Sequence, residues 1–291
     1  MDLLAYWRWD NYLRDLNEGA GFHFNSNQKR LHSEIQIGER LWLVTGKPAQ
    51  GGIQYILVAK LIVIGKTFNP PEYKYGKYRV WGDIKNSAYF SSDGPDLNEL
   101  LLTLKFKSGR KIKSKDLIGQ SLQTIRVLNP DDANILVEWS KFLSLEPRAY
   151  QIIDEELLEK SFEKDENSVK EAITKYHIGP SEKRKSFLKR IFKRNRRHAE
   201  LLQEKYLGRC QICAFDPIIL YGVRACYGHH IVYLSRGGID ELDNLILICP
   251  NHHEIIHSTN AVFDFYDLCY LYQNGRREPL VLNLHLKGYI S

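Results

Sequence analysis

The sequence contains no run of about 18–20 uncharged apolar residues, the length that a bilayer-spanning helix needs. Its first residues, MDLLAYWRWDNYLRDLN, carry charges throughout and lack the apolar stretch of a signal peptide. We therefore expect a cytoplasmic protein with no membrane partner. No internal repeat and no heptad pattern is visible, so repeat folds and coiled coils are not indicated.

Cysteine is also scarce. The five cysteines all lie in the last third of the chain. An odd number in a reducing compartment argues against a disulfide framework, and it leaves metal binding open. With 291 residues, of which 43% are hydrophobic and 26% charged, the chain can bury a sizeable core and favours two domains over one. Its net charge of +6 is compatible with a polyanionic partner.

Strand-like segments dominate residues 1–145. Runs rich in β-branched and aromatic residues predict strands at 39–46, 54–65, 78–84 and 87–90. Helices are predicted at 10–18 and at 129–143, where Asn129 can cap the helix and Pro130 suits its first position. The apolar stripe of the second helix comprises Ile135, Leu136, Trp139, Phe142 and Leu143. We expect an α+β protein that begins with a small β-barrel flanked by helices.

Residues 146–200 are predicted to form a charged helical linker. Their first half is acidic, with eight acids within eighteen positions: Asp154, Glu155, Glu156, Glu159, Glu163, Asp165, Glu166 and Glu171. It is interpreted as a solvated helix; the alternative is that it mimics DNA and shields a basic surface. The second half has nine Lys or Arg residues between 183 and 197, with apolar residues at helical spacing. This basic helix is a candidate for phosphate contacts through Arg190, Arg194 and Arg197. An exposed helix kept soluble by its charge, or one at a membrane surface, would show the same pattern.

Two short-spaced ligand pairs predict a structural zinc site. Cys210 and Cys213 form a CxxC pair, and Cys249 and His252 form a CxxH pair 36 residues later. Two such pairs separated by a loop are typical of a tetrahedral Zn²⁺ site in an intracellular chain. The remaining cysteines, Cys226 and Cys269, fall outside this spacing and are expected to be small buried residues.

Half of the ten histidines lie in GHHIVYLSRGGIDELDNLILICPNHHEIIH, residues 228–257. Together with CQIC, this stretch resembles the HNH endonucleases, whose core is a β-hairpin followed by a helix around one divalent metal. In particular it resembles the zinc-stapled HNH modules of restriction enzymes that attack modified DNA. The resemblance covers about ninety residues and implies an HNH endonuclease domain at 201–291.

The resemblance also implies roles for individual residues. His230 would be the general base that activates a water, because neutral imidazole suits that task near neutral pH. His229 and His253 would hold the catalytic metal, for which Mg²⁺, Mn²⁺, Zn²⁺ and Ni²⁺ all stay open. Asn244 would brace the loop and orient the base through hydrogen bonds rather than bind metal. His257 lies one helical turn after His253 and would touch phosphate or serve packing.

The connection between the hairpin strands, SRGGID at 235–240, contains two glycines. Glycines permit positive φ, so Gly237 and Gly238 predict a tight turn. Arg236 at its start is a candidate phosphate contact.

The front of the chain is rich in aromatic residues. Four of the five tryptophans, Trp7, Trp9, Trp42 and Trp81, lie in the first ninety residues. They could fill a barrel core or line a pocket that stacks a flipped base. Residues 3–145 resemble the PUA-like barrels, the EVE, YTH and SRA group, which read modified bases. That resemblance implies a modified-base recognition domain at 1–145.

Together these features favour a modification-dependent restriction endonuclease that cuts double-stranded DNA in defence against foreign DNA. A second hypothesis is an anti-phage or nicking nuclease whose front domain senses a different signal. A third is a zinc-stapled DNA-binding protein without catalysis. With one HNH site in each chain, a double-strand cut would suggest a homodimer.

Overall fold

The structure, a computed structural model, describes residues 1–18, 20–146, 155, 159, 167–168, 171, 197–236 and 238–289. The chain divides into two compact units. Unit 1 comprises Met1–Leu16, Phe22–Lys66 and Tyr78–Tyr150, and unit 2 comprises Asn17–Gly21, Thr67–Lys77 and Gln151–Ser291. Among the described residues, no helix is long and apolar enough to cross a membrane.

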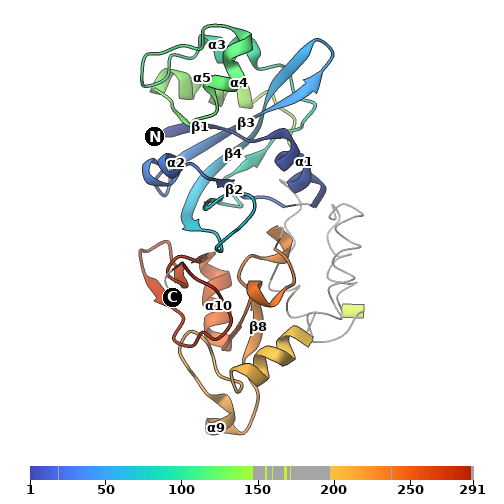
Figure 1. The fold of residues 1–291 in the computed structure, drawn as a ribbon, viewed down its shortest axis with the longest axis vertical. Coiled ribbons are helices and arrows are strands. Elements are labelled where there is room, and N and C mark those ends of the chain that lie inside the picture. The colour runs from blue at the N-terminus through green and yellow to red at the C-terminus, as the bar shows by residue number, and fades with distance from the viewer. Residues whose placement is uncertain are drawn as a thin grey trace. The chain divides into compact units, whose positions relative to one another are not determined.

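Unit 1 is built on one mixed sheet (Figure 1). Strand β1 pairs in parallel with β3 and antiparallel with β7, and β3 pairs antiparallel with β4. The strand order is β2–β5–β4–β3–β1–β7, with β6 also paired to β4. The elements are β1 (Asp2–Tyr6), α1 (Trp9–Glu18), β2 (His23–Ser26), α2 (Lys29–Glu34), β3 (Arg40–Ala49), β4 (Gly52–Phe68), β5 (Tyr78–Gly82), β6 (Ala88–Tyr89), α3 (Asn98–Thr103), α4 (Ile118–Ser121), β7 (Arg126–Val127) and α5 (Pro130–Ser140).

The predicted strands and helices of this unit are confirmed as elements, but the predicted closed barrel is not. The sheet is open, because its two end strands, β2 and β7, do not pair with each other among the described strands. A barrel requires that last pairing, since closure is what removes the edges of a sheet. The unit is therefore α+β with an open mixed sheet.

Both faces of this sheet are buried, and β3 shows why its sequence is almost continuously apolar. Side chains alternate between the two faces of a strand. Accordingly Leu41 and Leu43 enter one hydrophobic cluster, and Trp42 and Val44 enter the other. The first cluster includes Leu31 from α2, and the second is covered by residues of α3 and α5, which lie together in Figure 1. A run such as RLWLV is therefore expected wherever a strand has no solvated face.

Helix α5 begins as its sequence predicts. The Asn129 side chain accepts a hydrogen bond from the Asp132 backbone N–H at 2.9 Å, and Pro130 is the first helical residue. Its predicted apolar stripe is only partly correct. Leu136 is buried, whereas Phe142 lies beyond the end of the helix and is 85% exposed.

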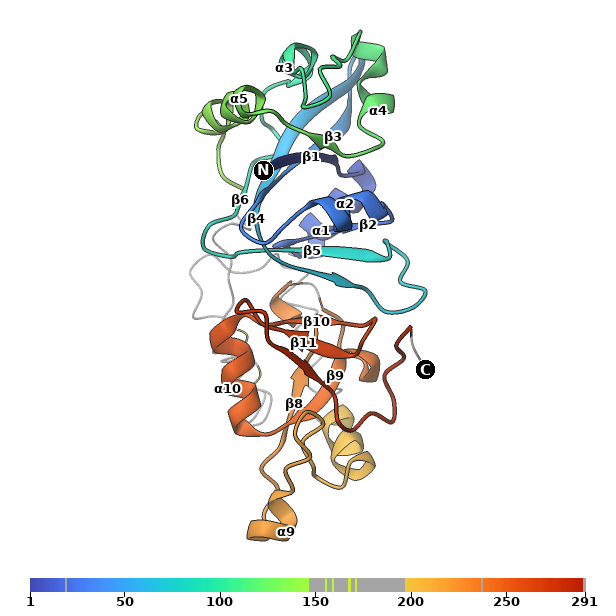
Figure 2. The same cartoon turned by 90° about the vertical axis from the view of Figure 1, so that its left-hand side faces the viewer.

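Unit 2 contains the predicted hairpin and helix. Strands β8 (Tyr227–His230) and β9 (Leu245–Ile248) pair antiparallel, and α10 (Pro250–Thr259) follows at once (Figure 2). Two short 3₁₀ turns, η3 (Leu234–Arg236) and η4 (Leu242–Asn244), lie in the connection between the strands. The remaining elements are α9 (Pro217–Tyr221), β10 (Val262–Asp264), β11 (Cys269–Leu271) and β12 (Arg277–Pro279). The last three strands form a separate antiparallel sheet that the sequence did not predict.

Strand β9 forms the centre of this unit's core. All four of its residues are buried and belong to one hydrophobic cluster with Leu202, Tyr206 and Ile256. Cys226 and Cys269 are buried as expected. Because β9 is fixed on both faces, the residues at its two ends, Asn244 and Cys249, are fixed with it.

Candidate metal centres and catalytic histidines

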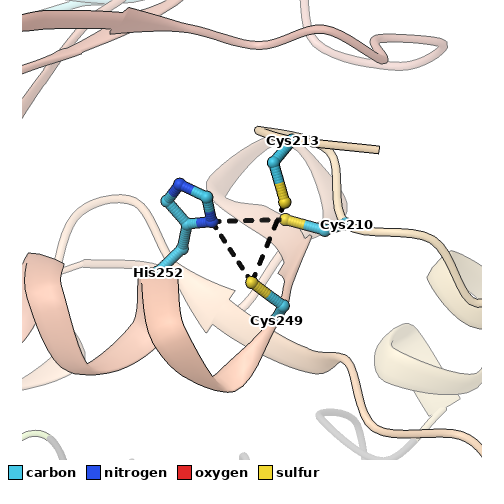
Figure 3. Close-up of side chains that lie close together, drawn as sticks. All are labelled: Cys210, Cys213, Cys249 and His252. Carbon is cyan, nitrogen blue, oxygen red and sulfur yellow. Dashed lines mark hydrogen bonds between the residues drawn. The ribbon is translucent and has the colours of Figure 1, made fainter. Parts of the chain in front are cut away.

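Three cysteines and a histidine converge at the start of α10 (Figure 3). Cys249 caps the helix and His252 lies in its first turn, so both follow directly from β9. Cys210 and Cys213 come from the segment before α9. Gln211 between them holds this segment to β9, since its backbone N–H donates to Leu247 O and its side chain accepts from Leu247 N, both at 2.8 Å.

The spacing of these four side chains fits a tetrahedral metal. The Cys213 and Cys249 Sγ atoms are 3.9 Å apart, and His252 Nδ1 lies 3.2 Å from Cys249 Sγ and 3.8 Å from Cys210 Sγ. Two sulfurs bound to one Zn²⁺ at ~2.3 Å in a tetrahedron would be separated by ~3.8 Å. Hydrogen bonding with Cys210, and to a smaller extent with His252, lowers the pKa of the Cys249 thiol to about 3 against the opposing effect of burial. Cys249 therefore favours the thiolate, the form that binds metal, whereas hydrogen bonding with Cys249 and burial raise the pKa of Cys210.

Three further histidines converge on one carboxylate oxygen. His229 comes from β8, and His253 and His257 lie one turn apart on α10. Glu159 Oε2 lies 3.1 Å from His229 Nδ1, 2.9 Å from His253 Nε2 and 3.0 Å from His257 Nε2. These four ligand atoms all lie within 4.8 Å of one another, so the set has the chemistry and spacing to hold a metal ion.

His230 lies beside this cluster and contacts two carboxylates. Its Nε2 is 3.2 Å from Asp240 Oδ1, and its Nδ1 is 3.3 Å from Glu159 Oε1. Burial alone would lower the pKa of His230, but hydrogen bonds with Asp240 and Glu159 raise it to about 9. In this arrangement His230 is held in its protonated form, which is opposite to the form that a general base requires.

The charge of the cluster resides on Glu159. Burial alone would raise the pKa of this carboxyl group, but interaction with His229 and hydrogen bonds with His230 and His253 lower it well below its ordinary value. Burial lowers the pKa of His229. A neutral His229 imidazole can still donate one N–H to the ionised Glu159 carboxylate.

Asn244 lies just before β9, at the end of η4, rather than within the strand. Its side chain forms three hydrogen bonds to the loop between the hairpin strands. Its Oδ1 accepts from Val232 N at 2.8 Å, and its Nδ2 donates to Val232 O at 2.9 Å and to Ile239 O at 2.8 Å. The amide therefore joins the two ends of the loop that follows His230.

The same loop requires a glycine for a reason other than the one expected. Gly238 does not have a positive φ. Instead, a Cβ atom at this position would lie 1.9 Å from the backbone O of Val232. Close approach of the backbone therefore demands glycine at 238, and Gly237 lies outside the described residues.

Glu159, Glu155 and Asp240 are the residues of this site that sequence reasoning missed. Glu155 Oε1 accepts a hydrogen bond from Leu234 N at 2.6 Å, and both glutamates are 5% exposed. The interpretation of the acidic segment as a solvated face is therefore wrong at these two positions. Their spacing of four residues was the available signal, since it places two side chains on one face of a helix.

The arginines that were predicted to contact phosphate differ in their exposure to solvent. Arg236 is buried, donates to Asn260 Oδ1 at 2.9 Å and stacks over Tyr233, so it is not presented to solvent as the sequence suggested. Arg197 is exposed at the start of the described helical backbone of residues 197–205. Arg190 and Arg194, with the rest of the basic helix, lie outside the described residues.

Three of the four candidate tryptophans of unit 1 are buried. Trp7 and Trp42 are buried in different hydrophobic clusters, and the Trp42 indole N–H donates to Asp2 Oδ1 at 2.8 Å. Trp81 is buried beneath Arg79. Only Trp9 of the four is partly exposed, and it stacks on Tyr12. The core interpretation, which the sequence left open, applies to Trp7, Trp42 and Trp81.

Comparison with known proteins identifies part of this unit. Residues 210–259 match the family model of the HNH endonucleases, and no curated protein matches the chain. One similar solved structure is the modification-dependent TagI restriction endonuclease, with a TM-score of 0.27 and 12% identity over 97% of this chain and 77% of that chain. Another is the type IV phosphorothioation-dependent restriction endonuclease ScoMcrA, with a TM-score of 0.22 and 15% identity over 87% of this chain and 48% of that chain.

Proposed function

Since residues 210–259 of this chain are an HNH endonuclease domain, we propose that the protein is a modification-dependent restriction endonuclease of the type IV kind. It would hydrolyse phosphodiester bonds of double-stranded DNA in the cytoplasm, in defence against foreign DNA. The observation that carries the proposal is the convergence of His229, His253 and His257 beside His230 within the HNH match.

Two metals are part of this proposal. The Cys210, Cys213, Cys249 and His252 set is the proposed structural Zn²⁺ site, because a closed set of soft ligands selects zinc. His229, His253 and His257 would hold the catalytic metal, with Mg²⁺, Mn²⁺ or Ni²⁺ as candidates. Bound there, a divalent cation would supply positive charge against the phosphate and the leaving oxygen.

His230 is the proposed general base, acting at Nδ1 in its neutral form, which requires the Glu159 carboxylate to leave Nδ1. Asp240 faces Nε2, so it favours the tautomer that carries its proton on that nitrogen. The Nδ1 lone pair is then directed away from Asp240 and can accept a proton from an attacking water. Asn244 acts as a positioning residue, since its hydrogen bonds hold the loop that follows His230.

The proposed role of residues 1–145 is to read a modified base. Support comes from the sequence resemblance of these residues to the PUA-like family, although their sheet is open. Most of them form the compact unit 1, whereas Asn17–Gly21 and Thr67–Lys77 belong to unit 2. Of the four tryptophans, Trp9 keeps the exposure that base stacking requires. A double-strand cut with one HNH site per chain would need two copies, so a homodimer on DNA is part of the proposal.

Matched plasmids that differ only in cytosine or adenine modification test this function. The full chain is incubated with each plasmid in Mg²⁺, Mn²⁺ or Ni²⁺, and the products are resolved on gels. We expect cleavage of one modified plasmid only. His230→Ala should lower the rate by about 10²-fold or more while DNA affinity is retained, because a general base acts mainly in the transition state.

Other outcomes select the other hypotheses. Equal cutting of modified and plain plasmids would indicate a nuclease whose front unit senses a different signal. Tight DNA binding with no cleavage in any metal would indicate a zinc-stapled DNA-binding protein. Cleavage at the wild-type rate by His230→Ala would show that another residue is the general base.

A further inference from the structure

The Glu159 carboxylate lies where the nuclease site should bind its substrate. One of its oxygens contacts the three histidines proposed to hold the catalytic metal, at 2.9–3.1 Å. The other contacts the proposed base, with His230 N at 2.9 Å and His230 Nδ1 at 3.3 Å. A single oxyanion thus spans the metal ligands and the base, which is the position that a scissile phosphate must take.

The groups around the Oε1 atom of this carboxylate are suited to an anion rather than to a cation. The backbone N–H of His230 donates to Glu159 Oε1, and a backbone N–H cannot bind a metal ion. A phosphodiester resembles a carboxylate here, since each presents two unesterified oxygens on one central atom and both accept charge-assisted hydrogen bonds. The carboxylate therefore fills a site built for an oxyanion.

A second buried glutamate, Glu155, also accepts a hydrogen bond from a backbone N–H of the loop that follows His230. Glu155 accepts the backbone N–H of Leu234 at 2.6 Å and is as deeply buried as Glu159. Both residues have helical backbone and lie four positions apart in the sequence. One oxygen of each carboxylate and a ring nitrogen of His230 lie within 4.8 Å of one another.

We propose that Glu159, supported by Glu155, is an internal phosphate mimic that keeps the nuclease site closed until DNA displaces it. This inference rests on the proposed nuclease function. It also predicts that DNA competes with Glu159. DNA phosphates and the Glu159 carboxylate require the same hydrogen-bond donors, so they cannot be bound together. The same contact engages His230 Nδ1, the atom that must be free to accept a proton.

Two substitutions of Glu159 in the full chain test the proposal. Glu159→Gln removes the charge, and Glu159→Asp keeps the charge but withdraws the carboxylate by one methylene. Duplex DNA affinity is measured by fluorescence anisotropy without added divalent metal, and cleavage rates are measured with metal. We expect both variants to bind DNA at least ten-fold more tightly than wild type, a change of about 1.4 kcal/mol, and to cut faster. Glu171→Gln is the matched control, because it removes the same charge from an exposed position of the same segment.

Several results would overturn the proposal. Unchanged DNA affinity in both Glu159 variants would exclude competition with phosphate. Slower cleavage with weaker divalent-metal binding, measured by calorimetry, would make Glu159 a metal ligand instead. An equal gain in DNA affinity in Glu171→Gln would show that the effect comes from net charge alone. If Glu159→Gln does not fold, Glu159→Asp and Glu155→Gln carry the same test. A gain in affinity without cleavage of any DNA would support the mimic and refute the nuclease function.

Discussion

Asn244 pairs with both backbone groups of Val232: its Oδ1 accepts from Val232 N at 2.8 Å and its Nδ2 donates to Val232 O at 2.9 Å. This reciprocal pair closes the loop that follows His230, and a third bond to Ile239 O secures the loop's far end. Asn244 is 5% exposed, so water is poorly placed to replace these bonds. The proposed role of Asn244 in catalysis therefore depends on the shape of the loop.

Asn244→Ala should lower the free energy of unfolding by at least about 2 kcal/mol, because each buried backbone group left without a partner costs about 1–3 kcal/mol. Urea unfolding measures this loss. Asn244→Asp is the informative comparison: it can still accept from Val232 N, but its second oxygen would face two carbonyl oxygens. We expect it to be no more stable than Asn244→Ala. Wild-type stability in both variants would show that the hydrogen bonds contribute little.

Gly238 allows a second prediction about the same loop. A Cβ at this position would meet the Val232 backbone O at 1.9 Å, so Gly238→Ala must displace backbone. Gly222→Ala is the matched control, since Gly222 has φ +71° and a Cβ added there would meet no atom within 4 Å. A left-handed alanine costs about 1–2 kcal/mol. Gly238→Ala should cost more than that in thermal unfolding and should reduce cleavage, and an equal cost in the two variants would contradict the steric argument.

Local and contiguous features could be predicted from the sequence. Helix α5 followed from Asn129 and Pro130, because a cap and a helix-start residue act over a few positions. The ββα unit could be predicted because the histidines of its motif all lie within thirty residues. In both cases the residues that interact are close neighbours in the chain.

Features that depend on distant contacts could not be predicted. Glu159 meets His229 across 70 residues and looks, in sequence, like the other acids around it. Trp42 belongs to a strand buried on both faces, so the pattern did not reveal whether its ring faces a core or a pocket. Arg236 resembles a surface cation, but it is buried and donates a hydrogen bond to Asn260, a residue just after α10.

The cysteine cluster predicts a metal-dependent fold. If zinc is the bound ion, the purified protein should contain about one tightly held Zn²⁺ per chain. Cys213→Ser should lose the zinc and lower the melting temperature. Cys213 is exposed, so this substitution leaves no cavity and any loss of stability must come through the ligand set. Elemental analysis and thermal unfolding measure the two effects. Cys226→Ala should keep its zinc because Cys226 is outside the cluster, and zinc-free wild-type protein that remains folded would refute the prediction.

Trp42 offers a test of what the aromatic residues of unit 1 do. Its ring is fully buried and its N–H donates to Asp2, whose carboxylate also pairs with Arg40. Trp42→Phe removes one hydrogen bond to a charged group and part of a large buried side chain. It should therefore lower the free energy of unfolding by about 1.5–3 kcal/mol.

The same variant should bind modified and plain DNA in the wild-type ratio, because the ring reaches no solvent. Trp9→Ala is the comparison, since Trp9 is partly exposed and could stack on a base. If Trp9 reads the base, its removal should weaken modified-DNA binding by about ten-fold, the equivalent of one stacked base at roughly 1–3 kcal/mol. Unfolding in urea and anisotropy with paired duplexes separate the two effects. If Trp42→Phe lost its preference for modified DNA at unchanged stability, Trp42 would belong to the pocket. If Trp9→Ala kept the wild-type ratio of affinities for modified and plain DNA, Trp9 would not belong to it.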